Sequence, residues 1–199
     1  MKTETYRNYT IEIEQSEDVE NPRNWDNATL MICSHKRYNL GDEKHDIDFN
    51  NYSSWEECKK AIIKKYNPVV IKPLYMYDHS GITISTSPFG DRWDSGQIGW
   101  VIFTREKALE EYGGKRITPA IKEKCENLLN SEVETYDNYL RGAVYDFTIK
   151  DENGDEVEND EGRMEFYGYD HEKSGLMSEA RGRIDAKIKE VGQQIKIEL

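Results

Sequence analysis

The stretch Leu74–Thr104, LYMYDHSGITISTSPFGDRWDSGQIGWVIFT, decides how this chain folds. Its two ends, Leu74–Tyr77 and Gln97–Phe103, are rich in β-branched and aromatic residues, which favour a half-buried strand over a helix. Glycine, proline and small polar residues between them mark turns, because glycine reaches positive φ without steric cost and proline fixes φ. We therefore expect an antiparallel sheet whose loops bring polar side chains together. The residues of this expected loop cluster are Asp78, His79, Ser80, Asp91, Arg92, Trp93, Asp94 and Ser95.

Alternating apolar and polar residues predict further strands. Thr5–Ile13 alternates in the manner of one half-exposed strand, and the apolar run Thr29–Cys33 is a candidate to pair with it. Ala143–Ile149 alternates again and leads into Asn153–Gly154, a strong hairpin turn. Met164–Tyr169 is the last expected strand.

Capping signals place the helices. Ser53 and Ser54 are candidate N-caps, and Glu56 and Glu57 follow three residues later to complete a capping box. Thr118–Pro119 is a second start signal, because the missing N–H of proline does no harm in the first helical turn. The expected helices are Ser54–Tyr66, Arg105–Tyr112, a longest helix from Thr118 to Gly142, and Ser178–Ile195. These elements predict an α+β fold with a small antiparallel sheet and about three to four helices, in a single domain over residues 1–199.

Charge and cysteine content narrow the class of function. The 199 residues carry a formal charge of −12, which disfavours direct binding to nucleic acid or an anionic membrane and favours a basic partner. Acidity for solubility alone is the other interpretation. Cys33, Cys58 and Cys125 are odd in number and widely spaced, which indicates a reducing cytosol. Neither a signal peptide nor a run of about 20 apolar residues is evident, so we expect no membrane segment.

Asp78, His79 and Ser80 are candidate catalytic residues, because a histidine beside a carboxylate and a hydroxyl can act as a base next to a nucleophile. Adjacent side chains on a strand point to opposite faces, however, which disfavours a relay between Asp78 and His79. A turn in which Asp78 or Ser80 accepts a nearby backbone N–H is the favoured interpretation.

Metal and phosphate motifs are incomplete. Cys33 and His35, with His45 or His79, offer zinc-ligand types without paired spacing. The run Asp151–Glu161 has seven acids and no base, but its glycine does not stand at the sixth place of a calcium loop. We expect no metal and no cofactor.

Aromatic residues of the central stretch are candidates to stack a nucleotide base. They are Tyr75, Tyr77, Phe89, Trp93 and Trp100. Core packing is the expectation for at least half of them, because large aromatics supply most of a small domain's buried area. Trp93 is expected to be exposed, since its neighbours on both sides are polar or charged.

Several segments carry a resemblance. They are Arg37–Gly41 (RYNLG), Leu74–Phe89, Trp93–Gly99 (WDSGQIG), Glu132–Phe147 (EVETYDNYLRGAVYDF) and Phe166–Tyr169 (FYGY). On these segments the chain resembles a family of short acidic proteins of phages and integrated mobile elements of Gram-positive gut bacteria. Residues 90–92 and the amino-terminal segment differ from the family's commoner pattern, so no role is carried onto them.

The resemblance implies an accessory protein of a mobile element that acts in the host bacterial cytoplasm, where small acidic proteins are often anti-CRISPR or antirestriction inhibitors. Such an inhibitor binds the basic nucleic-acid site of a nuclease or CRISPR effector with its carboxylates. The candidate partner-binding residues are Glu123, Glu126, Glu132, Glu134, Asp137, Asp151, Asp155, Glu156 and Glu158. Lys122, Lys124 and Arg141 interrupt the acids of the long helix, so steric inhibition without DNA mimicry stays open. One alternative is a protein that binds or hydrolyses a small ligand such as a signalling nucleotide, with the loops around Asp78 to Asp94. Another is a structural or regulatory phage protein whose acidity has no role in binding.

Overall fold

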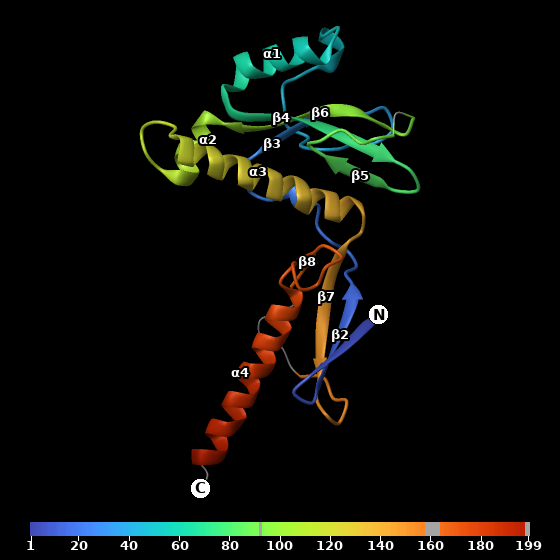
Figure 1. Cartoon of the computed structure of the whole chain (residues 1–199), viewed down its shortest axis with the longest axis vertical. Coiled ribbons are helices and arrows are strands. Elements are labelled where there is room, and N and C mark those ends of the chain that lie inside the picture. The colour runs from blue at the N-terminus through green and yellow to red at the C-terminus, as the bar shows by residue number, and fades with distance from the viewer. Residues whose placement is uncertain (92, 158–163, 198–199) are drawn as a thin grey trace. The chain divides into compact units, whose positions relative to one another are not determined.

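The computed structural model describes residues 1–91, 93–157 and 164–197, with the side chains of the last helix described as far as residue 191. The described residues form four α-helices and two four-stranded antiparallel sheets, which confirms the α+β class (Figure 1). Contacts divide the chain into a terminal unit, residues 1–19 and 142–199, and a central unit, residues 20–141. That residues 1–199 act as a single domain stays a prediction.

The sheet of the central unit is built around β6 (Ser95–Thr104), which lies between β3 (Leu30–Cys33) and β4 (Pro68–Asp78). β5 (Ile82–Ser85) completes the sheet as an edge strand beside β4. The two apolar ends of the decisive stretch therefore lie side by side in antiparallel register, as predicted. Gly99 of β6 faces β3 so closely that a Cβ there would lie 2.0 Å from the carbonyl oxygen of Ile32, which explains a glycine inside a central strand.

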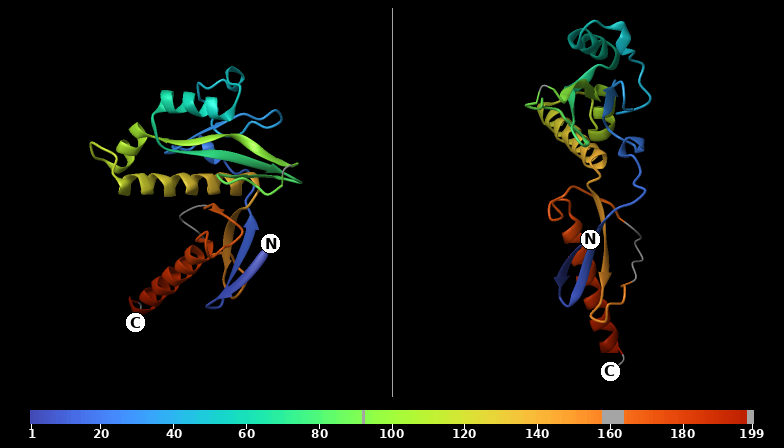
Figure 2. Two further views of the ribbon diagram at one scale, coloured as in Figure 1. Left: turned by 45° about the horizontal axis from the view of Figure 1, so that its top comes forward. Right: turned by 90° about the vertical axis from the view of Figure 1, so that its right-hand side faces the viewer.

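Helices cover both faces of the central sheet (Figures 1 and 2). On one face α1 (Trp55–Tyr66) packs Cys58 and Ile62 against a core that includes Trp100 and Ile102. On the other face lie α2 (Arg105–Tyr112) and α3 (Pro119–Leu140), which share a larger core with alternate residues of the same strands. The alternation of side chains along a strand thus divides one sheet between two cores. The short 3-10 helices η1 (Pro22–Asn24) and η2 (Phe49–Asn51) lie in the loops.

Three of the four predicted helix starts are confirmed, whereas the last helix begins at Leu176, two residues before the predicted Ser178. The side chains of Ser54, Thr104 and Thr118 accept the N–H groups of Glu57, Lys107 and Ile121, each at 3.2 Å. In α1 the capping box is shared between two serines, because the Glu57 carboxylate accepts the N–H of Ser53 at 2.9 Å and not that of Ser54. This hydrogen bond lowers the pKa of Glu57.

The terminal unit is a second four-stranded antiparallel sheet covered by one helix. Its strands are β1 (Lys2–Tyr6), β2 (Tyr9–Gln15), β7 (Val144–Lys150) and β8 (Phe166–Tyr167), and its helix is α4 (Leu176–Ile197). Ile11, Ile13 and Ile149 point to the face where α4 contributes Met177 and Ile184. Each unit therefore has a hydrophobic core made of its own residues.

Two strand predictions were wrong. Thr5–Ile13 is not one strand but a hairpin, because Arg7 and Asn8 take φ of 47° and 66° and reverse the chain between β1 and β2. A two-residue turn with both residues at positive φ has the twist that a hairpin needs. Thr29–Cys33 does not pair with this segment but joins β6 in the other sheet.

Candidate functional site

The predicted loop cluster lies where β4 ends and β6 begins. The N–H of Asp78 donates to the carbonyl of Asp94 at 2.8 Å, and the Asp94 carboxylate lies 3.1 Å from Nδ1 of His79. Ser80, at φ of 58°, begins the turn toward β5. The register of the two long strands thus brings residues 78–80 and 94 together.

The contacts of the three candidate catalytic residues differ from a relay. Asp78 accepts hydrogen bonds from the Arg37 guanidinium and, at 3.1 Å, from the Tyr38 hydroxyl. His79 pairs with Asp94 instead, and its side chain is 65% exposed. The turn is present as predicted, but Asp78 bonds side chains of a distant segment and not the nearby backbone. An exposed histidine whose carboxylate partner is also exposed has the features of a surface contact and not of a buried catalytic pair.

Trp93 is 96% exposed at the tip of the loop between β5 and β6, as the sequence predicted. Asp91 holds the loop, because its carboxylate accepts the N–H groups of Asp94 at 3.1 Å and Trp93 at 2.7 Å. These two bonds lower the pKa of Asp91. Trp100 is in the core at 5% exposed, whereas Tyr77 is half-buried and stacks near His79 and Phe89.

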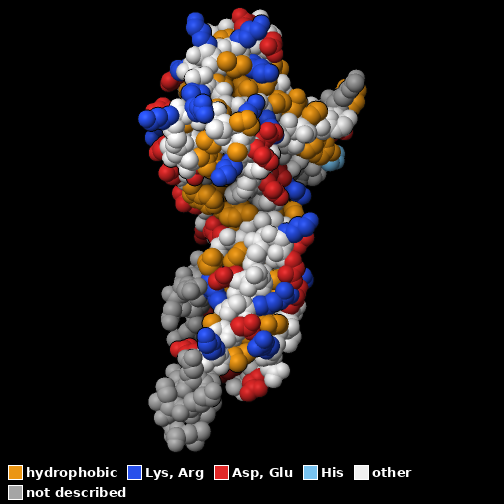
Figure 3. Space-filling model, turned by 60° about the vertical axis from the view of Figure 1, so that its left-hand side comes forward, with side chains coloured by type: hydrophobic (Ala, Val, Ile, Leu, Met, Phe, Trp, Pro, Cys, Tyr) orange, Lys and Arg blue, Asp and Glu red, His pale blue; other side chains and the backbone are white. Residues whose placement is uncertain are grey.

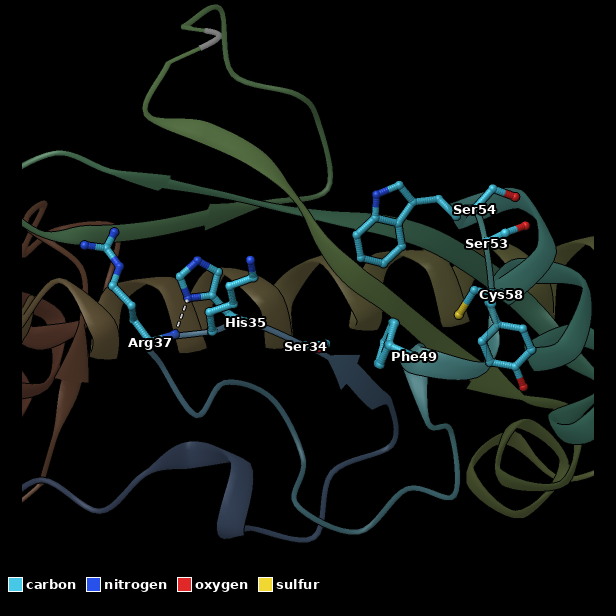
Figure 4. A pocket seen from close by; sticks show the side chains of 10 residues that line it. Ser34, His35, Arg37, Phe49, Ser53, Ser54 and Cys58 are labelled. Carbon is cyan, nitrogen blue, oxygen red and sulfur yellow. Dashed lines mark hydrogen bonds between the residues drawn. The ribbon is translucent and has the colours of Figure 1, made fainter.

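A pocket of about 670 Å³ opens elsewhere in the central unit, and none of the described residues of the predicted loop cluster lines it. We name it the α1 pocket; its ten lining residues are Ser34, His35, Lys36, Arg37, Phe49, Tyr52, Ser53, Ser54, Trp55 and Cys58. Figure 4 shows His35 and Arg37 on one side and Phe49, Ser53, Ser54 and Cys58 on the other.

The sequence did not predict the α1 pocket. The signals that point to it are two adjacent basic residues after β3 and three aromatics, Phe49, Tyr52 and Trp55, spaced three apart before and at the start of α1. Only folding brings these two segments together. Burial raises the pKa of the Cys58 thiol, so this part of the wall is uncharged at neutral pH.

Glu132, a predicted partner-binding residue, is instead part of an internal network. Its carboxylate accepts the N–H groups of Ala28 and Thr29 at 2.8 and 3.2 Å and the hydroxyl of Thr29. It also lies 3.3 Å from the guanidinium of Arg23, whose side chain is 2% exposed and is bound bidentately by Asp42. This carboxylate therefore stabilises the segment before β3.

The other predicted acids of α3 divide into two groups. Asp137 is occupied, since its Oδ1 accepts the Thr83 hydroxyl at 2.6 Å and the Ile84 N–H at 2.7 Å. Glu126 pairs with Lys72 at 2.6 Å, which lowers its pKa. Glu123 and Glu134 are exposed. Figure 3 shows Lys and Arg interleaved with Asp and Glu on the visible face of the central unit.

The predicted acids after β7 lie in a turn of the terminal unit. Asp151 shapes the turn, because its Oδ1 accepts the N–H groups of Asn153 and Asp155 at 2.8 and 3.0 Å, and these bonds lower its pKa. Asp155 and Glu156 are exposed. Glu158 lies outside the described residues. Gly154, at φ of 87°, confirms the predicted turn.

The negative charge is divided unequally between the units. The terminal unit contains 20 acidic and 10 basic residues, and the central unit contains 19 and 17. Their formal charges are therefore −10 and −2. Most of the net negative charge of the chain therefore lies in the terminal unit, the smaller of the two.

The described part of the chain holds no group of three or more His, Cys, Asp or Glu side chains placed to bind a metal ion. Likewise, no helix within the described ranges has the length and apolar character needed to cross a membrane. Comparisons of the chain with protein-family models, curated proteins and solved structures found no match.

Proposed function

We propose that the protein is a non-enzymatic inhibitor of a host defence nuclease of the CRISPR-effector or restriction type, acting in the bacterial cytoplasm. Its terminal unit binds the basic nucleic-acid site of that nuclease. The observation that carries the proposal is the formal charge of −10 on this unit against −2 on the central unit. A concentrated charge of one sign steers a protein toward a partner of the opposite sign.

Ion pairs within the terminal unit occupy most of its basic side chains. The described basic side chains of the terminal unit mostly have an acidic partner within it, so the unpaired excess is negative. The pairs are Lys2–Glu4, Arg7–Asp185, Lys150–Glu12, Lys173–Asp170, Arg181–Glu172, Arg183–Glu179 and Lys187–Glu190. The excess includes the exposed Glu152, Asp155 and Glu156 of the turn and Glu14 of β2.

The sheet of the terminal unit has a polar face opposite α4. Glu12 and Glu14 alternate with the core residues Ile11 and Ile13, so they point to this face. Asp146 of β7 stands directly opposite Glu14. This face therefore presents carboxylates from two neighbouring strands.

The spacing favours docking over mimicry of DNA charge by charge. Residues on one face of a strand are about 6.8 Å apart, whereas duplex DNA carries one charge per about 1.7 Å of its axis. The α3 acids do not close this gap, because Glu132 and Asp137 are occupied inside the central unit. The proposal is therefore an acidic plug that blocks a basic channel.

A DNA-cleavage assay tests the proposal. A CRISPR effector with its guide and a set of restriction nucleases each cut plasmid DNA with and without excess full-length protein. We expect at least one nuclease to be inhibited, and the inhibition to weaken between about 50 and 300 mM salt as charges are screened. Uninhibited cleavage throughout at low salt, or inhibition insensitive to salt, would contradict the proposal.

A further inference from the structure

We propose that the α1 pocket of the central unit binds a planar aromatic anion of mononucleotide size. Nothing in the acidic-inhibitor proposal requires this site, which lies in the unit with little net charge. Three properties of the pocket favour such a ligand: its volume, its aromatic wall and the sign of its charged side chains.

The volume suits a nucleotide better than a small inorganic anion. Ligand pockets measure about 300–1,000 Å³, and this pocket holds about 670 Å³. A phosphate ion alone would leave most of that space filled with water. A ring with a sugar and a phosphate attached would displace this water from apolar side chains.

One wall presents aromatic rings. Phe49 and Trp55 meet edge to face, with centroids 5.8 Å apart and planes at 72°, and Tyr52 lies between them in sequence. The Trp55 side chain is 37% exposed although it begins a helix that buries its neighbour Cys58. Such rings can stack on the flat face of a nucleobase.

The opposite wall carries only positive or neutral groups. His35, Lys36 and Arg37 line it, and none of the ten lining residues has a carboxylate. In a chain with 39 acidic and 27 basic residues this selection favours an anion. Lys36 is exposed and free to reach a phosphate, whereas Arg37 already donates to Asp78.

His35 supplies a directed donor. Its Nδ1 accepts the N–H of Arg37 at 3.4 Å, which leaves Nε2 as the ring nitrogen that can donate. The ring is held flat against Tyr38, with centroids 5.2 Å apart and an interplanar angle of 8°. The serine hydroxyls of the facing wall are partly occupied, since Ser54 caps Glu57 and Ser53 donates to its carboxylate at 2.8 Å. We therefore assign the phosphate to the side of His35 and Lys36.

Calorimetric titration of the full-length protein tests the site with ADP, GDP, adenosine and inorganic phosphate as probes. We expect ADP or GDP to bind, and adenosine and phosphate to bind at least tenfold more weakly, because each supplies only half of the recognised chemistry. Adenosine or phosphate binding as tightly as the nucleotides would overturn the assignment. So would the absence of a binding heat with both nucleotides at millimolar concentration.

Matched variants localise the site. Trp55→Ala and Lys36→Glu should each weaken nucleotide binding at least tenfold. Trp93→Ala removes an exposed tryptophan outside the pocket and Lys60→Glu reverses an exposed charge on the same helix, so both should bind within twofold of the parent. Circular dichroism checks that each variant is folded, and equal losses in pocket and control variants would refute the site. Nuclease inhibition should be unchanged in all four, which separates this test from that of the proposed function.

Discussion

The terminal and central units are built alike but use their acids differently. Each has a four-stranded antiparallel sheet, covered by α4 in the terminal unit and by α1, α2 and α3 in the central unit. In the central unit, carboxylates such as Glu132 and Asp137 bind backbone and side chains of the same unit. In the terminal unit the acids outnumber the bases two to one. Most of the formal charge of −12 is therefore carried by the terminal unit and is not spread evenly over the molecule.

The units also differ in residues that report on folding. All four tryptophans and all three cysteines lie in the central unit. Tryptophan fluorescence therefore follows the central unit alone, whereas far-ultraviolet circular dichroism follows both. The two signals together can therefore distinguish the unfolding of one unit from that of the other.

The largest stability effect is expected at Glu132. Glu132→Ala leaves the Arg23 guanidinium, 2% exposed, with one carboxylate fewer and two backbone N–H groups unpaired. Breaking such a buried pair costs about 3–5 kcal/mol. Urea unfolding followed by tryptophan fluorescence measures the loss. Glu134→Ala, at an exposed position two residues away, should change the stability by less than about 0.5 kcal/mol, and equal effects of the two would show that the network is not structural.

A core cavity in the terminal unit should destabilise that unit first. Ile184 is 1% exposed in its core, so Ile184→Ala should cost about 2–4 kcal/mol. The circular dichroism transition should then begin at lower urea while the fluorescence midpoint stays in place. Val191→Ala, at a position 42% exposed on the same helix, is the control. A fluorescence midpoint that falls together with the circular dichroism signal would mean that the units unfold as one, as the single-domain prediction requires.

The next largest loss of stability is expected in the central unit, when a methyl group is added to β6. Gly99→Ala places a Cβ 2.0 Å from the Ile32 carbonyl oxygen and 2.9 Å from the Cys33 Cα, and both neighbours are backbone. We expect a loss of about 1–3 kcal/mol in the fluorescence transition. Gly96→Ala, on the same strand with no atom within 4 Å of its Cβ, should cost much less. Similar losses for both would contradict the close approach of β3 and β6.

The smallest effect on stability is expected at alkaline pH. Burial raises the pKa of the Cys33 thiol from 9.0 to about 12. Because the folded state holds this proton more tightly, the thiol's contribution is complete below pH 9 and is lost as the pH rises toward 12. Urea midpoints at pH 7, 9 and 10.5 should therefore fall less steeply for Cys33→Ala than for the parent. Parallel slopes would show that the thiol ionises equally easily in the unfolded and folded chain.

Local features were predictable from the sequence and distant pairings were not. The caps at Ser54 and Thr118 and the exposure of Trp93 depend on neighbours a few residues away. The turn at Arg7 and Asn8 was missed because neither residue is a glycine.

The candidate sites depend on contacts that no local pattern displays. Glu132 meets Ala28 across 104 positions and Asp78 meets Arg37 across 41. The walls of the α1 pocket likewise come from segments separated in sequence. The net charge could be counted from the sequence. Its division between the two units could be assigned only once the structure showed that the two ends of the chain form one unit.

The central claim is that the terminal unit carries the partner site, and a pair of charge reversals tests it directly. The first variant changes three exposed residues of the terminal unit together to lysine, namely Glu152, Asp155 and Glu156. The control variant changes three exposed residues of the central unit to lysine, namely Glu43, Glu106 and Glu111. The concentration needed for half-maximal inhibition of the sensitive nuclease is measured for both. We predict a rise of at least about tenfold for the first triple variant and less than about twofold for the second; equal rises, or a larger rise for the central-unit variant, would contradict the claim.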